Sequence, residues 1–123
     1  MKFTIQGRFP SLNEYTNANR KNRYAGSKMK KDCHKQVIEA IREHKLPKVQ
    51  SYPITIEITW YEKDRRRDID NVTYGIKFIN DSLVEAKIIE DDSQRYVKSI
   101  INHIEVDRQN PRIEVEILEK ETT

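Results

Sequence analysis

The sequence predicts an α/β fold of the α+β type, a small single domain in which two helices pack on one face of a mixed β-sheet. Two observations support this. Several segments alternate apolar and polar residues with the period of a strand, and two others repeat apolar residues every three or four positions, as amphipathic helices do. Their order along the chain, β-α-β-α-β-β, suits such a sheet. With 123 residues, the chain is predicted to form one domain over residues 1–123.

The first half of the chain is predicted to contain one strand and one helix. Residues 2–9 alternate as a strand does,. Residues 10–26 begin with a proline and are rich in asparagine, so we expect a loop. Ser27 is predicted to cap a helix that ends before Pro47. Its apolar stripe has a period of four and comprises Met29, Cys33, Val37 and Ile41, with His44 beside it. We expect Cys33 and His44 to lie on or beside the buried stripe and to be packing residues rather than ligands.

The second half is predicted to contain three strands and one helix. Residues 51–62 give the strongest strand pattern of the chain,. The helix is predicted over residues 71–86, with one apolar stripe made of Val72, Ile76, Ile79, Leu83 and Ala86,. A short segment with an acidic turn, KIIEDDSQ, follows it. Residues 96–106 and 112–118 are predicted strands, joined by the turn DRQNP,.

Charge is distributed unevenly along the chain. Residues 1–50 hold 12 Lys/Arg against 4 Asp/Glu, whereas residues 51–123 hold 11 against 16. Residues 20–35 contain seven Lys/Arg and one acid, with Tyr15 and Tyr24 nearby for stacking. This asymmetry fits a polyanion ligand combined with a site that gathers cations. It also fits a dimer held by opposite charges, and the basic segment alone fits a merely solvated surface.

The composition also limits the cellular environment. No stretch approaches the roughly 18 apolar residues that span a bilayer, and the N-terminus has no uninterrupted apolar signal region,. We therefore expect a cytoplasmic protein with no membrane partner. The single cysteine, Cys33, excludes an internal disulfide and a cysteine-rich zinc site,.

The segment RRRDIDN, residues 65–71, concentrates opposite charges in seven residues. One interpretation is an exposed turn in which these arginines and aspartates pair with one another. Asp70 or Asn71 is also predicted to cap the following helix, a contribution of about 1 kcal/mol. Capping explains one aspartate but not two. In an extended chain, Asp68 and Asp70 point to the same side with Cα atoms about 6.6 Å apart, close enough for both carboxylates to bind one cation.

Further charged residues extend this candidate site. Lys77 lies two helical turns beyond Asp70, where it can hold a phosphate oxygen, although a solvated surface lysine is the alternative. Glu90, Asp91 and Asp92 form a second acidic group. If it folds back beside Asp68, the carboxylates repel one another unless a divalent cation neutralises them. Oxygen ligands favour Mg²⁺ or Mn²⁺ over zinc. Such an ion flanked by arginines suits phosphodiester hydrolysis.

These motifs together resemble the RusA family of Holliday junction resolvases, which are phage and prophage endonucleases. The resemblance rests on the arginines, Asp-x-Asp-Asn, a helix carrying a lysine, then IIEDDSQ, and it extends to FPSLNEYTNANRKNRY near the N-terminus. Position 74 departs from the family pattern, since it is Tyr74 where the family has its lysine, and AKII replaces the family's glycine before the acidic pair.

The resemblance implies a small homodimeric endodeoxyribonuclease that binds four-way DNA junctions and cuts two strands symmetrically with Mg²⁺ in recombination and repair. Its catalytic residues map onto Asp68, Asp70 and Asp92, with Lys77 as the catalytic lysine, and its metal ligands onto Asp68, Asp70, Asp92 and the neighbouring Asp91. No small-molecule cofactor beyond the metal is implied. A symmetric dimer also explains how so small a protein places two sites on two strands.

The predicted DNA contacts come from two regions of the chain. They are Arg65, Arg66, Arg67, Asn13, Tyr15, Arg20, Lys21, Arg23 and Lys28. Three other functions stay open: a non-catalytic DNA-binding module that uses its acids structurally, a metal-dependent nuclease acting on other branched or single-stranded nucleic acid, and an interaction protein held by charge complementarity.

Overall fold

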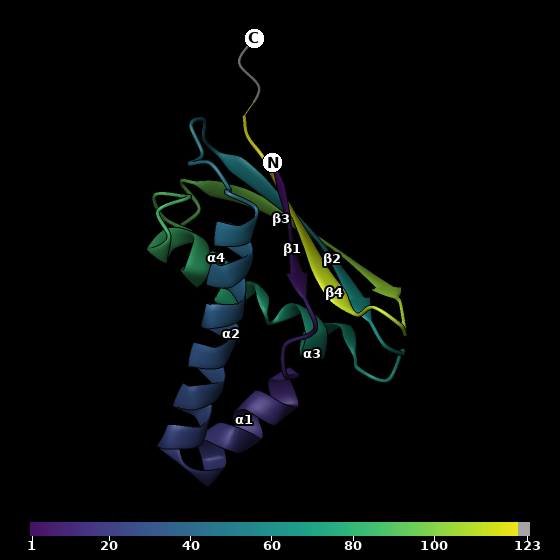
Figure 1. Ribbon diagram of the computed structural model, residues 1–123. Helices are drawn as coiled ribbons and strands as arrows, with labels where there is room; N and C mark the ends of the chain where they lie inside the picture. The colour runs from purple at the N-terminus through teal and green to yellow at the C-terminus, as the bar shows by residue number, and fades with distance from the viewer. Residues whose placement is uncertain (121–123) are drawn as a thin grey trace.

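A single four-stranded sheet organises the molecule, which a computed structural model describes over residues 1–120. The strands are β1 (Lys2–Gln6), β2 (Ile54–Glu62), β3 (Val97–Val106) and β4 (Arg112–Leu118), and they lie in the order β1-β4-β2-β3. β2 pairs in parallel with β3 and antiparallel with β4, and β4 pairs antiparallel with β1. The predicted mixed sheet and the order β-α-β-α-β-β are therefore confirmed. The helices lie on one face of the sheet (Figure 1).

The core lies between this sheet and the helices. Every second residue of β2, from Ile54 to Trp60, is buried against the helices. The intervening residues face the other side of the sheet and stay partly exposed. This alternation confirms the strand predicted from the same pattern in the sequence, although β2 begins at Ile54 rather than at residue 51,. Trp60 fills the centre of the core while its indole N–H donates to the Asn102 side chain at 2.8 Å.

The prediction of two helices is wrong. Within residues 1–120, three helices have ten residues or more, α1 (Leu12–Lys21), α2 (Arg23–Glu43) and α4 (Ile76–Glu85). A single-turn helix, α3 (Ile69–Thr73), precedes α4. The prediction of a loop over residues 10–26 is also wrong, because most of that segment forms α1 and the start of α2. No helix within residues 1–120 is long and apolar enough to cross a membrane.

Side-chain caps explain why α1 and α2 form where the composition suggested a loop. The Ser11 hydroxyl accepts from the Glu14 N–H at 3.1 Å, and Ser11 with Glu14 three residues later has the capping-box spacing,. The Asn22 side chain accepts from the Ala25 N–H at 2.6 Å and caps α2. The predicted cap Ser27 is therefore wrong, since it lies inside α2. Asparagine favours caps as strongly as it favours loops.

The stripe along α2 is confirmed at Cys33, Val37 and Ile41, which are buried. Burial, with the nearby Asp32 carboxylate, raises the pKa of the Cys33 thiol to about 11. The prediction that His44 is a packing residue on or beside this stripe is wrong. His44 is the exposed C-cap of α2, and its Nδ1 lies 2.9 Å from the Ala40 carbonyl oxygen.

The predicted helix over residues 71–86 begins earlier, at Ile69, and is broken at Tyr74 and Gly75. At this break the backbone closes i−3 hydrogen bonds, from the Gly75 N–H to Val72 and from the Lys77 N–H to Tyr74,. Despite the break, the apolar stripe still faces the core, with Val72, Ile79 and Leu83 buried and Ile76 and Ala86 half-buried.

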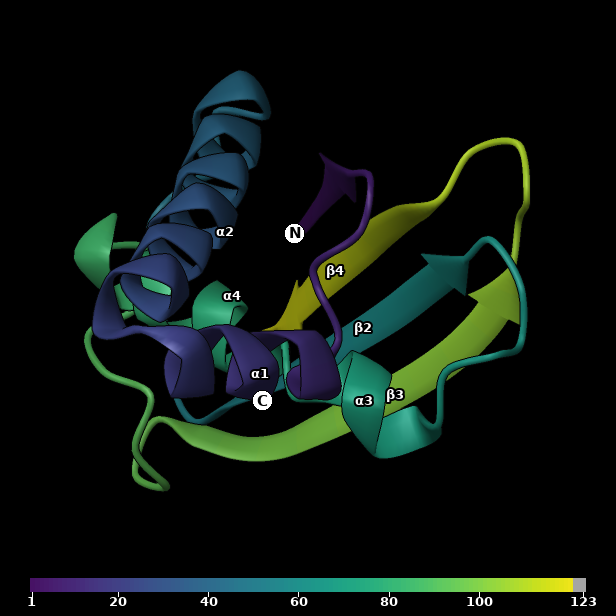
Figure 2. The same cartoon turned by 90° about the horizontal axis from the view of Figure 1, so that it is seen from below.

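The edge strand β3 is the least covered part of the sheet. Its register with β2 turns Ile100, Ile104 and Val106 toward the helix side, yet Ile100 and Val106 are exposed. A hollow of about 200 Å³ joins Ile104 and Val106 to Ile69, whose exposed fraction is 70%. We call Ile69, Ile100, Ile104 and Val106 the β3 apolar patch. Figure 2 shows β3 at the rim of the sheet.

Candidate active site

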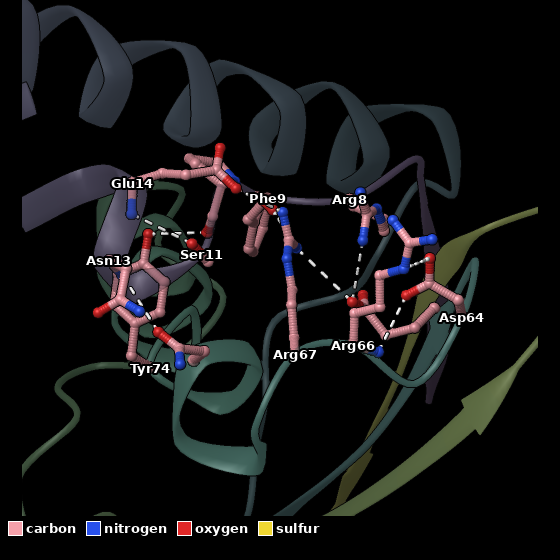
Figure 3. Close-up of polar contacts among 12 residues, drawn as sticks. Arg8, Phe9, Ser11, Asn13, Glu14, Asp64, Arg66, Arg67 and Tyr74 are labelled. Carbon is pink, nitrogen blue, oxygen red and sulfur yellow. Dashed lines mark hydrogen bonds and ion pairs between the residues drawn. The ribbon is translucent and has the colours of Figure 1, made fainter. Parts of the chain in front are cut away.

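The segment between β2 and α3 is held in place by a buried ion-pair network. Glu62 ends β2 and is buried, and its Oε1 accepts from Arg8 at 3.0 Å. The Arg67 guanidinium lies 3.6 Å from the same oxygen and donates to the Phe9 carbonyl at 3.0 Å and to Glu14 at 2.9 Å (Figure 3). The exposed fraction of the Arg67 side chain is 17%. Arg67 therefore clamps the loop before α3 onto the segment that joins β1 to α1.

The electrostatics of Glu14 fit this role. Partial burial acts to raise the pKa of the Glu14 carboxyl, but the Ser11 hydrogen bond and the Arg67 guanidinium outweigh it and lower the pKa. Glu14 is ionised, as the ion pair with Arg67 requires.

The other two arginines of the segment point into solvent. The exposed fraction of the Arg66 side chain is 89%, and its Nε lies 3.7 Å from Asp64. The Asp64 carboxylate accepts from the Arg66 backbone N–H at 3.0 Å, which lowers the pKa of Asp64. Arg65 is exposed and has no carboxylate within 4.0 Å among residues 1–120. Arg65 and Arg66 are thus accessible to a ligand, whereas Arg67 is committed to the fold.

Asp68 and Asp70 have no cationic partner in the part of the chain that the structure describes, although three arginines precede them. Asp68 is the N-cap of α3, with extended backbone (φ −67°, ψ 158°) and no side-chain capping hydrogen bond. Asp70 lies in the first turn and accepts only from the N–H of Asn71, at 3.1 Å. Both are exposed. The helix therefore starts two residues earlier than predicted.

This arrangement contradicts the interpretation of RRRDIDN as a self-paired turn. Arg66 pairs with Asp64, and Arg67 pairs with Glu62 and Glu14. None of these three carboxylates was predicted to belong to the site. The sequence spacing gave no signal for the last two, because they come from β2 and α1.

Contacts between α1 and α3 position the two aspartates. The Asn71 side chain accepts from the Asn13 backbone N–H at 3.2 Å, and the Tyr74 hydroxyl donates to the Pro10 carbonyl at 3.0 Å (Figure 3). Burial raises the pKa of Tyr74, so its hydroxyl stays protonated. Tyr15 is half-buried and packs against Tyr74, with ring centroids 6.1 Å apart. Tyr15 was predicted to contact DNA, but its ring serves this packing.

The predicted Lys77 lies in the first turn of α4, exposed and 3.9 Å from Asp81. Its two-turn spacing from Asp70 assumed a continuous helix, and the break at Tyr74 and Gly75 removes that geometry.

Asp91 and Asp92 are exposed and precede β3, whereas Asp68 follows β2. Because β2 and β3 are parallel, the two acidic segments flank opposite ends of the sheet. No group of three or more His, Cys, Asp or Glu residues able to hold a metal ion is found within residues 1–120. The expectation that one chain gathers these carboxylates is therefore corrected.

The remaining predicted DNA contacts cluster at the corner between α1 and α2. Arg20, Lys21, Arg23 and Lys28 are all exposed there, and only Lys28 has a carboxylate partner within the described chain, Asp32 at 3.1 Å. Tyr24, which is 78% exposed, lies among them. This corner protrudes from the body of the molecule (Figure 1).

Two exposed aspartates beside accessible arginines, on a domain with a basic helical corner, are the features of a metal-dependent enzyme that acts on nucleic acid. The model of a protein family described as Endodeoxyribonuclease RusA matches residues 6–118. The chain belongs to this family. It is a RusA-family Holliday junction resolvase, a DNA endonuclease that hydrolyses phosphodiester bonds in recombination and repair with the help of a metal ion. A search of curated protein sequences found no match.

The residues fit such an ion. The Asp68 carboxylate makes no hydrogen bond and no ion pair with the described residues, and Asp70 makes one hydrogen bond to its neighbour. Uncommitted carboxylate oxygens are the ligands of hard divalent cations. Two carboxylates would make an incomplete ligand set for such an ion, so further ligands would have to come from outside this pair.

Proposed function

We propose that this protein is a Mg²⁺-dependent homodimer that resolves four-way DNA junctions by paired, symmetric cuts. The observation that carries the proposal is that Asp68 and Asp70 are exposed and have no cationic partner among residues 1–120, although three arginines precede them. Asp68 and Asp70 are only two residues apart, so their unneutralised charges repel each other, and a divalent cation bound by both removes that cost,.

Each residue then has a role that follows from its surroundings. Asp68 and Asp70 hold Mg²⁺, or Mn²⁺ in its place, which supplies charge neutralisation at the phosphate and activates water. Arg65 and Arg66 hold the phosphodiester backbone beside them. Lys77 contributes positive charge from the start of α4.

A second copy of the chain completes the site. Asp91 and Asp92 flank the opposite end of the sheet from Asp68 and Asp70, so we propose that Asp92 or Asp91 of the partner subunit supplies the third carboxylate. The β3 apolar patch supports this dimer. Three of its four residues, Ile69, Ile100 and Val106, are exposed, it lies beside a strand edge that no strand within residues 1–120 pairs with, and Ile69 stands between the two aspartates. Burying such a patch and edge stabilises an oligomer.

The corner between α1 and α2 binds the DNA of the junction. Arg20, Lys21, Arg23 and Lys28 contact phosphates, and Tyr24 offers the exposed ring on which an unpaired base stacks. The Asn13 side chain is exposed at the start of α1, and it makes no hydrogen bond to the described residues.

The experiment that tests this function replaces the two free carboxylates. Asp68→Asn and Asp70→Asn each keep the size of the side chain and are expected to lower single-turnover cleavage of a four-way junction in Mg²⁺ by at least 10³-fold, since each removes a ligand charge. Junction affinity in EDTA is expected to stay equal or to rise, because a negative charge beside the phosphates is lost.

Glu43→Gln is the matched control, because Glu43 is an exposed acid on α2 without an ion-pair partner among residues 1–120. It is expected to cut like the wild type. A linear duplex and a nicked duplex of the same sequence run beside the junction. Cleavage by Asp70→Asn at the wild-type rate would refute the metal site, and equal cleavage of the linear duplex would refute junction selectivity.

A further inference from the structure

A second basic surface lies away from the proposed metal site, in a groove of about 990 Å³ between α2 and the end of α4. The floor is apolar and includes the half-buried Ile38, Leu46 and Ala86. The rim is cationic and comprises Lys30, Lys31, Lys35, Arg42 and Lys45. Among the described residues, Glu85 is the one acid that lines the groove, and it is in contact with the His34 ring.

The rim cations are largely unpaired. Lys35 lies 4.0 Å from Glu39, but no carboxylate among the described residues comes within 4.0 Å of Lys30, Lys31, Arg42 or Lys45. Concentrating unpaired cations along one groove is unfavourable for the isolated protein and favourable once a polyanion neutralises them.

Four of these rim cations, Lys31, Lys35, Arg42 and Lys45, continue the basic corner along one face of α2. Residues 24, 28, 31, 35, 42 and 45 follow one another at intervals of 4, 3, 4, 7 and 3 along α2, which is the spacing of one helix face. We call this face the α2 basic track. It runs from Tyr24 at the corner to Lys45 beyond the end of the helix. At 1.5 Å per residue, the track is about 31 Å long, and DNA rises 3.4 Å per base pair, so it matches roughly nine base pairs.

The opposite side of the molecule repels DNA. The face of the sheet turned away from the helices carries four glutamates, Glu57, Glu105, Glu114 and Glu116. Two cations on this face form ion pairs with them: Lys2 lies 4.0 Å from Glu116, and Arg112 lies 2.7 Å from Glu114. Charge therefore directs a duplex to the helix side of the molecule.

We propose that the α2 basic track and its groove bind the phosphate backbone of one junction arm, several base pairs away from the cut. This inference rests on the proposed function and extends it, since it names a DNA contact that the metal site does not require. Its length makes it specific: the track contributes affinity only when the arm is long enough to reach the groove.

The test compares two four-way junctions, one with arms of about 15 base pairs and one with arms of about 5, each titrated in EDTA so that no cutting occurs. The groove variant is Lys30→Gln, Lys31→Gln and Arg42→Gln together, because glutamine keeps helix propensity. The control variant is Lys2→Gln, Arg108→Gln and Lys120→Gln, which removes the same charge from exposed positions outside the track.

The wild type and the control variant are expected to bind the long-armed junction more tightly than the short-armed one. The groove variant is expected to lose most of that difference, and its slope of log affinity against log salt on long arms is expected to fall by about 3 if each cation meets one phosphate. On short arms its affinity is expected to match that of the control variant.

Three results would overturn the inference. The first is an affinity of the wild type that does not depend on arm length, and the second is a groove variant that binds long-armed junctions as tightly as the control variant does. The third is a groove variant that binds DNA as the wild type does but no longer binds a polyglutamate peptide that the wild type binds. That result would assign the groove to an acidic protein segment. Failure of the wild type to bind or cut any junction would refute the proposed function itself.

Discussion

Burial separates residues that the sequence presents as equivalent. Arg66 and Arg67 are adjacent, but one side chain is 89% exposed and the other 17%. The difference arises from Glu62, whose buried carboxylate would cost several kcal/mol if it were left without cations. Arg8 and Arg67 satisfy it from two loops. The charge of Arg67 is therefore largely used inside the protein, whereas that of Arg66 faces solvent.

This difference predicts opposite phenotypes for two neighbouring substitutions. Arg67→Ala is expected to lower the free energy of unfolding by about 1–3 kcal/mol, because Glu62 keeps only Arg8 as a partner. Arg66→Ala is expected to change stability by less than about 0.5 kcal/mol, while the salt dependence of junction binding falls by about one unit of slope. Urea denaturation and salt titrations measure the two effects, and equal loss of stability in both variants would contradict this division.

At the scale of elements, the break between α3 and α4 is a packing feature. An ideal Cβ on Gly75 would lie 2.7 Å from Phe9 Cδ2 and 3.1 Å from the Trp60 ring. The two rings are part of the core, and Phe9 packs edge-on against Trp60 and Phe78. The helical segment therefore turns where it meets Phe9, which places Asp68 and Asp70 at its free end beside α1.

Gly75→Ala is expected to destabilise the fold by about 1–3 kcal/mol, since overpacking against core rings outweighs the roughly 1 kcal/mol that alanine gains over glycine in a helix. Thermal unfolding measures this loss. Gly26→Ala is the contrasting variant, because the closest atoms there belong to the Asn19 side chain, which can rotate away. A Gly75→Ala protein as stable as the wild type would show that the rings do not enforce the break.

At the scale of the whole molecule, positive and negative charges lie on opposite faces. The helix side holds the basic corner and the α2 basic track, and the far side of the sheet is acidic. The proposed metal ligands are likewise divided between the two ends of the sheet. A dimer brings such separated groups together without any change in the fold of one chain.

Mixed dimers test the shared site. Asp70→Asn and Asp92→Asn are each expected to be inactive alone. Mixing the two variants lets their subunits exchange and form mixed dimers. If each site takes Asp70 from one subunit and Asp92 from the other, one of the two sites in a mixed dimer has both aspartates, so nicking of one strand is expected to return. If both aspartates serve the same chain's site, every site of the mixture lacks one of them and no activity returns. Mixing either variant with itself is the control.

Much of this protein was predictable from the sequence because local pattern and burial agreed. The alternation of Ile54, Ile56, Ile58 and Trp60 identified β2, and the spacing of Cys33, Val37 and Ile41 identified α2. Where two local preferences compete, the pattern failed: the asparagines before residue 26 fit a loop or a helix cap, and the structure uses Asn22 as a cap. The capping-box spacing of Ser11 and Glu14 was the signal that could have revealed α1.

The sequence by itself determined the mixed α+β sheet, the charge asymmetry and the family, since these depend on periodicity, composition and motif. Only the tertiary structure decided which charges are free. Glu62 and Glu14 pair with Arg67 from other elements, Asp68 and Asp70 have no cationic partner among residues 1–120, and the parallel pairing of β2 with β3 separates them from Asp91 and Asp92. Ion pairs depend on distances of a few ångströms across the fold, and no spacing along the chain encodes them.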